Sequence, residues 1–306
     1  MRVANHVQIQ NLVKRLFRET YGVEDDTLYQ DAELRERIRG AVKELRLSYQ
    51  NSTCITNYDA EEIRKAYMIA YYPYFIVPAG YVVSNHVVPH AQAEAGNWTF
   101  FAAGPCPELL GVARIRIFRT PPPKRVITLD REKDWFPYQK LTRNLCEEYF
   151  GFERGLKFYH SFNIGDMNQL EGSNSNVKPH LRDTNLFFMQ NYLSHLPDTP
   201  QNVNNFLNWF STLARMAKPQ SFFVFVDLNY NSTSTVFSKL VNAGFLESNG
   251  LKKIAAHIPT DGEPYEFHHQ GSTQAISDNI FTGEFGLLPK FLTKFYFVVL
   301  QKEGSI

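Results

Sequence analysis

Short apolar segments alternate with amphipathic segments from residue 97 to the end of the chain, and this alternation constrains the fold more than any other feature. The apolar segments are rich in Phe, Val and Ile, as buried strands are. Strands that alternate with helices predict an α/β fold, with a mostly parallel sheet covered by helices on both faces. The predicted strands lie at 98–103, 125–130, 156–162, 185–190, 221–227 and 295–300. The predicted helices lie at 108–115, at 141–150, from Pro200 onward, and at 235–243 with Gly244 as the C-cap.

The first 95 residues show a different pattern, in which apolar residues recur at helical spacing. Asp59 and Glu62 match a capping box, which predicts the start of a helix. Pro73 is expected to end or kink that helix at the preceding residue. A second apolar segment follows, and we expect Pro78 and Gly80 to interrupt it. This region therefore predicts a helical cap.

Two units are expected from these patterns. Residues 1–95 form the N-terminal helical cap, and residues 96–306 form the α/β domain. The stretch at about 259–293 is irregular and rich in Gly, His and polar residues, so it is expected to be an insertion before the last strand.

Composition excludes several classes of protein. The chain has 32 basic and 31 acidic residues, and a net charge of +1 supplies no overall field to attract nucleic acid. Three cysteines without close spacing predict neither a disulfide framework nor a metal site. No run of about 18 apolar residues exists to span a membrane, and no signal peptide is recognisable, so a cytoplasmic location is expected.

The loop after the first predicted strand is the main candidate for ligand binding. Gly104 permits a close approach of backbone to ligand, and Asp130, at the end of the next strand, can accept hydrogen bonds from ribose hydroxyls. A dinucleotide site is less favoured, because the glycine fingerprint is absent and Pro105 and Pro107 each lack an N–H. A P-loop pattern does not occur. An alternative stays open, in which Gly104 serves only a turn and Asp130 only caps a helix.

The segment Phe100–Glu108, with sequence FFAAGPCPE, resembles the first motif of class I S-adenosylmethionine-dependent methyltransferases. The segments at 188–197, 216–227 and 243–245 and the last strand are similar to later motifs of that family, so the resemblance covers about residues 97–300. It implies a Rossmann-like fold with a seven-stranded sheet, S-adenosylmethionine as the cofactor and a small-molecule acceptor. The tyrosines before the domain are similar to those of mitochondrial-ribosome-associated Rsm22-like methyltransferases, although the iron–sulfur cysteines of that group are missing.

The resemblance also implies roles for individual residues. Cofactor-binding positions are Ala102, Gly104, Pro105, Cys106, Asp130, Arg131, Asp166, Met167, Gln190 and Asn191. Asn191, Tyr192 and His195 are the expected catalytic residues, because they follow the fourth strand and should face the transferred methyl group. His195 is the candidate general base, and the alternative is a capping or core histidine.

Two departures from the family pattern lead to further expectations. Ala102 stands where the family has an acid that holds the ligand's amino group, and the hydroxyls of Tyr67 and Tyr71 are candidates to replace it. The alternative is that these tyrosines only pack a core. No metal is expected, because His268 and His269 have no carboxylate or cysteine at ligand spacing. Two alternatives to the small-molecule methyltransferase stay open: an inactive scaffold and an RNA methyltransferase.

Overall fold

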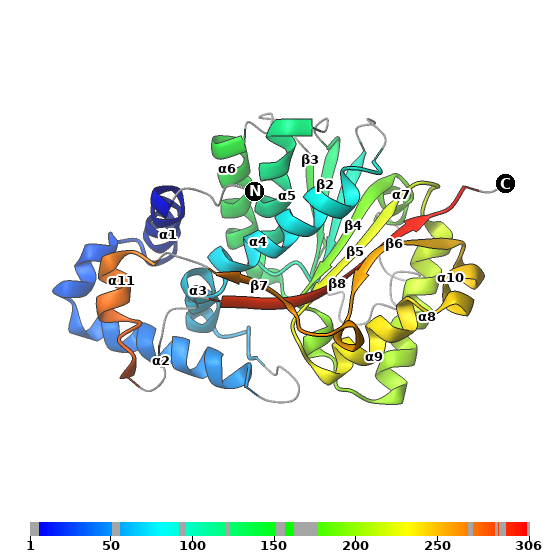
Figure 1. Ribbon diagram of the computed structural model, residues 1–306. Helices are drawn as coiled ribbons and strands as arrows, with labels where there is room; N and C mark the ends of the chain where they lie inside the picture. The colour runs from blue at the N-terminus through cyan, green and yellow to red at the C-terminus, as the bar shows by residue number, and fades with distance from the viewer. Residues whose placement is uncertain are drawn as a thin grey trace.

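A computed structural model gives the arrangement of the chain (Figure 1). It describes residues 6–50, 56–91, 96–119, 123–150, 157–161, 177–268, 272–284, 287 and 292–304. A mostly parallel sheet of eight strands forms its centre, and helices cover both faces of that sheet. The predicted α/β fold is therefore confirmed.

Five strands of the sheet are parallel, in the spatial order β3, β2, β1, β4, β5. Their bounds are Asn97–Phe101 for β1, Arg125–Leu129 for β2, Lys157–Ser161 for β3, Thr184–Gln190 for β4 and Phe222–Asp227 for β5. The order changes direction between β1 and β4, because the chain first adds strands on one side of β1 and then on the other. The carboxyl ends of these two strands therefore border the crevice where such sheets bind ligands.

One strand, β8 (Leu292–Lys302), runs antiparallel to all the others. It pairs with β5, with β6 (Leu251–His257) and, at its beginning, with β7 (Tyr265–His268). Seven strands were expected and the sheet has eight, because β7 is an additional strand. The stretch expected to be irregular contains β7 and the helix α11 (Gln274–Asn279), so that expectation was wrong for these residues.

Alternate residues along each strand point to opposite faces of the sheet, so that two hydrophobic cores form. Phe100 and its neighbours pack under α4 (Tyr72–Val82), α5 (Pro107–Arg119) and α6 (Phe136–Phe150). Phe101 and its neighbours pack on the other face. The helices on that face are α8 (Pro200–Met216), α9 (Asn231–Leu240) and α10 (Ala243–Asn249). The short α7 (Lys178–Arg182) lies at the edge of the same face.

The N-terminal helices lie at one end of the sheet, beside α11 (Figure 1). They are α1 (His6–Tyr21), the 3₁₀ helix η1 (Asp25–Tyr29), α2 (Ala32–Ser48) and α3 (Glu61–Ala70). Arg39 of α2 donates a 2.6 Å hydrogen bond to the carbonyl of Asn279, and the hydroxyl of Tyr29 donates to Asp278 at 3.0 Å. The chain just before β8 is thereby attached to the N-terminal helices. The division of the chain at residue 95 stays a prediction.

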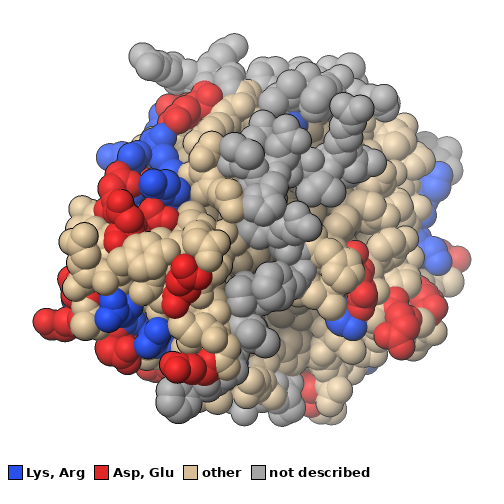
Figure 2. All heavy atoms as spheres, turned by 60° about the vertical axis from the view of Figure 1, so that its left-hand side comes forward, with Lys and Arg blue, Asp and Glu red and all other residues tan. Residues whose placement is uncertain are grey.

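Charged side chains of both signs mix on the face that carries these helices (Figure 2). Arg15 forms an ion pair with Glu148 at 2.6 Å, and Arg18 pairs with Glu24 at 3.4 Å. The part of this face that the structure describes shows no large patch of one sign, in agreement with the net charge of +1.

Pro73 breaks the helix as predicted. α3 ends at Ala70, α4 begins at Tyr72, and the axes of the two helical segments differ by 56°. Pro78 does not interrupt α4, which continues to Val82 and then into a π-helical turn, η2 (Val83–Val87). α4 packs so closely on α5 that a Cβ at Gly111 would clash with the carbonyl oxygen of Ile76.

Two predicted helix caps were wrong. α3 begins one residue later than predicted, at an N-cap of Ala60 without a side-chain cap, and the Asp59 carbonyl accepts from Arg64 at 2.9 Å instead. Gly244 lies inside α10, which Asn242 caps at its start and Gly250, with φ of 58°, ends. Among the described residues, no single helix is long and apolar enough to cross a membrane.

Candidate functional site

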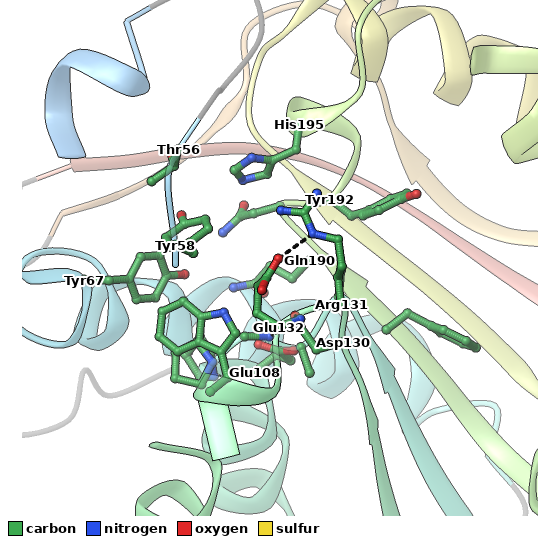
Figure 3. Close-up of a pocket in the computed structure, with 18 of the residues that line it drawn as sticks. Thr56, Tyr58, Tyr67, Glu108, Asp130, Arg131, Glu132, Gln190, Tyr192 and His195 are labelled. Atoms are coloured by element: carbon green, nitrogen blue, oxygen red, sulfur yellow. Dashed lines mark hydrogen bonds and ion pairs between the residues drawn. The ribbon is translucent and has the colours of Figure 1, made fainter. Parts of the chain in front are cut away.

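A cavity of about 370 Å³ opens at the carboxyl ends of β1 and β4, where the strand order changes direction (Figure 3). Its walls come from the loops after β1, β2 and β4 and from the segment before α3. This is the position at which open α/β sheets bind their ligands, and the volume lies within the range of small-molecule sites. The residues that line it are Tyr49, Thr56, Tyr58, Tyr67, Phe101–Pro105, Pro107, Glu108, Leu129–Glu132, Trp135, Gln190–Tyr192, His195 and Leu196.

The loop after β1 has an unusual backbone. Ala102, Gly104 and Cys106 have φ angles of 48°, 49° and 62°, in the left-handed region that residues with a Cβ rarely occupy. The loop is held from below by α6, because Gln139 donates to the Gly104 carbonyl at 2.7 Å and Thr142 donates to the Pro105 carbonyl at 2.6 Å. Backbone strain of this kind persists where surrounding contacts fix it, and it is common at ligand sites.

Asp130 connects this loop to the loop after β2. One carboxylate oxygen accepts from the Gly104 N–H at 2.6 Å, and the other accepts from the Glu132 N–H at 2.9 Å. Burial raises the pKa of Asp130 to about 6, although the two hydrogen bonds act in the opposite direction. Asp130 therefore fixes the shape of the loop and also lines the cavity.

Glu108 is a site residue that sequence analysis did not single out. It is the second residue of α5, only 3% of its surface is exposed, and it lines the cavity. Burial raises the pKa of its carboxyl to about 8. The sequence feature that could have identified Glu108 is an acidic residue directly after the glycine loop, at the start of a helix.

The residues after β4 form another wall. Asn191 has a φ of 55°, and its N–H donates to the carbonyl of Val226 at 2.9 Å. A 3₁₀ turn, η5 (Leu193–His195), follows it and brings His195 to the cavity.

Asp227, at the end of β5, holds that turn in place. Its carboxylate accepts from the N–H groups of Leu193 at 2.7 Å, Leu228 at 2.8 Å and Ser194 at 3.4 Å. Burial raises the pKa of Asp227 to about 7. The position of His195 therefore depends on a buried carboxyl of the neighbouring strand.

Aromatic rings form a further wall of the cavity, and Figure 3 shows Tyr58 and Tyr67 there. The rings of Tyr58, Tyr67 and Trp135 contact one another, with centroid distances of 5.3 Å for Tyr58–Trp135, 6.0 Å for Tyr58–Tyr67 and 5.7 Å for Tyr67–Trp135. The Tyr58 hydroxyl is 2.9 Å from that of Tyr49. The His195 ring lies edge-on to Tyr49 at 5.9 Å. Of these rings, Tyr49, Tyr58 and Trp135 were not predicted as site residues.

Most of the predicted site residues meet at this cavity. Those that line it are Tyr67, Ala102, Gly104, Pro105, Asp130, Arg131, Gln190, Asn191, Tyr192 and His195. Tyr71 lies behind the wall, stacked on Tyr49 at 4.7 Å, and Cys106 is buried below the loop. Asp166, Met167 and His269 lie outside the described residues, and His268 lies on β7, away from the cavity. No group of His, Cys, Asp and Glu in the described part of the chain could hold a metal ion.

No protein-family model and no curated protein sequence matches this chain. Among solved structures, an O-methyltransferase family protein from Burkholderia thailandensis is 13% identical, with 80% of this chain and 60% of that chain covered and a TM-score of 0.41. An rRNA methylase from Streptococcus thermophilus is 9% identical, with 73% and 95% covered and a TM-score of 0.39. The SAH complex of DhpI is 11% identical, with 87% and 98% covered and a TM-score of 0.41. Similarity at this level assigns no activity.

Proposed function

We propose that this chain is an S-adenosylmethionine-dependent methyltransferase that transfers a methyl group to a small molecule. One observation carries the proposal: the left-handed loop after β1 is hydrogen-bonded to the acid after β2, Gly104 N–H to Asp130 at 2.6 Å, at the edge where the strand order reverses. In sheets of this kind, the first loop approaches a nucleotide ligand closely and the acid binds its ribose hydroxyls.

The cavity fits this ligand in two respects. Of the described residues, only Trp135 would have ring atoms within 4 Å of a Cβ at Gly104, so there is room for a ligand beside the backbone. Gln190 contributes a buried side-chain oxygen that no described residue hydrogen-bonds. The residues proposed to hold the cofactor are Tyr67, Ala102, Gly104, Pro105, Asp130, Arg131, Gln190 and Asn191, which line the cavity, together with Tyr71, Cys106, Asp166 and Met167.

Bound S-adenosylmethionine supplies a methyl group on a positively charged sulfur. Alignment of acceptor and methyl group can supply much of the acceleration, so the protein mainly has to position the acceptor. Asn191, Tyr192 and His195 are proposed for this task, and the imidazole of His195 takes up the acceptor's proton where the acceptor loses one. The rings of Tyr49, Tyr58 and Trp135 exclude water and offer flat surfaces for an acceptor.

A specific observation favours a second candidate, a binding or scaffold protein without catalysis. Both oxygens of Asp130 already accept backbone hydrogen bonds, and Ala102 replaces the expected acid. RNA as the acceptor has no comparable support, because the net charge is +1 and the charges on the face of Figure 2 are mixed.

Isothermal titration with S-adenosylmethionine and with S-adenosylhomocysteine separates these candidates. The methyltransferase requires saturable binding of both ligands and thermal stabilisation by each. Absence of heat and of stabilisation at millimolar ligand would identify the scaffold. RNA that copurifies with the protein and is released by salt would identify an RNA-directed enzyme.

A further inference from the structure

The Glu108 carboxyl is buried at the cavity, and among the described residues no positive charge lies beside it. It lies at the N-terminus of α5, where an anion is favoured, yet burial raises its pKa to about 8. The titratable groups that face it are Asp130 from the loop after β2, Cys106 from its own loop and Tyr72 from α4, and none of them is a cation. Within the described residues, neither Glu108 nor Asp130 forms an ion pair.

Gln190 supplies a second acceptor in the same cavity. Its side-chain N–H donates to the carbonyl of Phe75 at 2.8 Å, and this bond fixes the orientation of the amide. The other end, Oε1, is buried and has no hydrogen-bond partner in the part of the chain that the structure describes, and the residue is only 5% exposed. A buried acceptor of this kind costs free energy until a donor reaches it.

A donor that carries positive charge suits both acceptors, the Gln190 amide oxygen and an ionised Glu108 carboxylate. A protonated primary amine has three N–H donors and one positive charge, so it satisfies a carboxylate and an amide oxygen together. The faces of Tyr67 and Trp135, which line the same cavity, also favour a cation.

We propose that Glu108 and Gln190 bind the ammonium group at the amino-acid end of the ligand, and that Glu108 ionises when the ligand binds. This inference rests on the proposed function. The neutral carboxyl loses its proton to solvent, and the resulting carboxylate pairs with the ammonium group. Glu108 thereby takes over the task for which Ala102 lacks a side chain.

The test uses the wild-type protein and three ligands. S-adenosylmethionine and S-adenosylhomocysteine carry the ammonium group, whereas 5′-methylthioadenosine has the same nucleoside and sulfur without it. Titrations at pH 7 in buffers of different ionisation enthalpy count the protons released. With a pKa of about 8, about nine-tenths of the Glu108 side chains are protonated at this pH, so the first two ligands should release about 0.9 proton and the third almost none.

The affinity ratio between S-adenosylhomocysteine and 5′-methylthioadenosine gives a second measurement. Ionised Glu108 increases about ninefold between pH 6 and pH 7, and the ratio should increase by the same factor. Glu108→Gln should abolish both the proton release and this increase and should bind S-adenosylhomocysteine at least tenfold more weakly. Glu132→Gln is the matched control, because Glu132 lines the same cavity but pairs with Arg131 at 2.6 Å, and it should retain the proton release.

Binding of S-adenosylmethionine without proton release would overturn this inference and leave the methyltransferase proposal intact. Equal proton release by 5′-methylthioadenosine would do the same, and this comparison needs no variant to fold. If none of the three ligands binds at millimolar concentration, the methyltransferase proposal fails and the inference fails with it.

Discussion

Substitution of Gly104 tests whether the loop backbone meets the ligand. Its φ of 49° costs a residue with a Cβ about 1–2 kcal/mol, and a β-branched residue more. Steric contact adds little to this cost, because a Cβ would stand 3.8 Å from the Trp135 ring, which is an ordinary van der Waals distance. Gly104→Ala should therefore lower the melting temperature by roughly 2–8 °C, at about 2–4 °C per kcal/mol for a chain somewhat smaller than this one. Gly104→Val should melt lower still but keep its fold.

The Gly104 variants should rank differently in ligand binding and in stability. Gly104→Val should abolish binding of S-adenosylmethionine, because its side chain takes the space beside the backbone. Gly104→Asn is the matched control, since Asn tolerates the left-handed region and should melt nearer to wild type while it blocks the same space. Differential scanning calorimetry and isothermal titration measure the two properties separately. If Gly104→Val melts lower but binds S-adenosylmethionine like the wild type, the loop is only a turn.

Three further predictions concern the other walls of the cavity. Asp130→Ala should weaken S-adenosylmethionine binding by about 1.5–3 kcal/mol, on the order of 10- to 150-fold in titration, and unchanged affinity would remove Asp130 from the site. Asp227→Asn should lower the free energy of unfolding by about 1–3 kcal/mol at pH 5, because one backbone N–H loses its acceptor. The folded-state pKa of Asp227, about 7, lies above its unfolded value of about 4. The stability that this group gives the wild-type protein therefore falls as pH rises from about 4 to 7. Urea unfolding should show that the difference in unfolding free energy between the wild type and the Asn variant shrinks over that range. Tyr67→Phe and Tyr71→Phe keep the rings and delete the hydroxyls, and normal melting with normal S-adenosylmethionine binding in both variants would show that these hydroxyls have no role in cofactor binding.

The sequence predicted the five parallel strands and β8, and the clearest signals came from strands that are buried on both faces. β1, β4 and β5 read as continuous apolar segments because helices cover them on each side, and their ends could be placed within a few residues. Since parallel strands end at one edge, the residues after them could be assigned to one site from chain position alone. This is why Gly104 and Asp130 were found together.

β6 and β7 were missed for the opposite reason. β6 is an edge strand with two exposed lysines and small alanines, and β7 has mainly exposed residues, so neither has the apolar pattern of a buried strand. What makes them strands is pairing with β8, which is a tertiary interaction. Local sequence patterns carry little information about such pairing.

The aromatic wall could not be predicted from spacing either. Tyr49 follows α2, Tyr58 precedes α3, and Trp135 belongs to the loop after β2, so no periodicity links them. They meet because α2 and α3 pack at the open end of the sheet. Tyr67 of α3 and Tyr71 just after it were selected only because tyrosines are dense in this segment, although only Tyr67 of the two lines the cavity.

Three buried carboxyls near this edge of the sheet have raised pKa values, and their surroundings separate two different roles. Asp227 is raised by burial although three backbone N–H groups point at it, and it does not line the cavity, so its role is to hold η5. Glu108 is also raised by burial, but it lines the cavity, and no described cation lies beside it. Asp130 both fixes the loop and lines the cavity. A raised pKa alone therefore does not distinguish these carboxyls, and it is their position at the cavity that makes Glu108 and Asp130, and not Asp227, candidates for ligand binding.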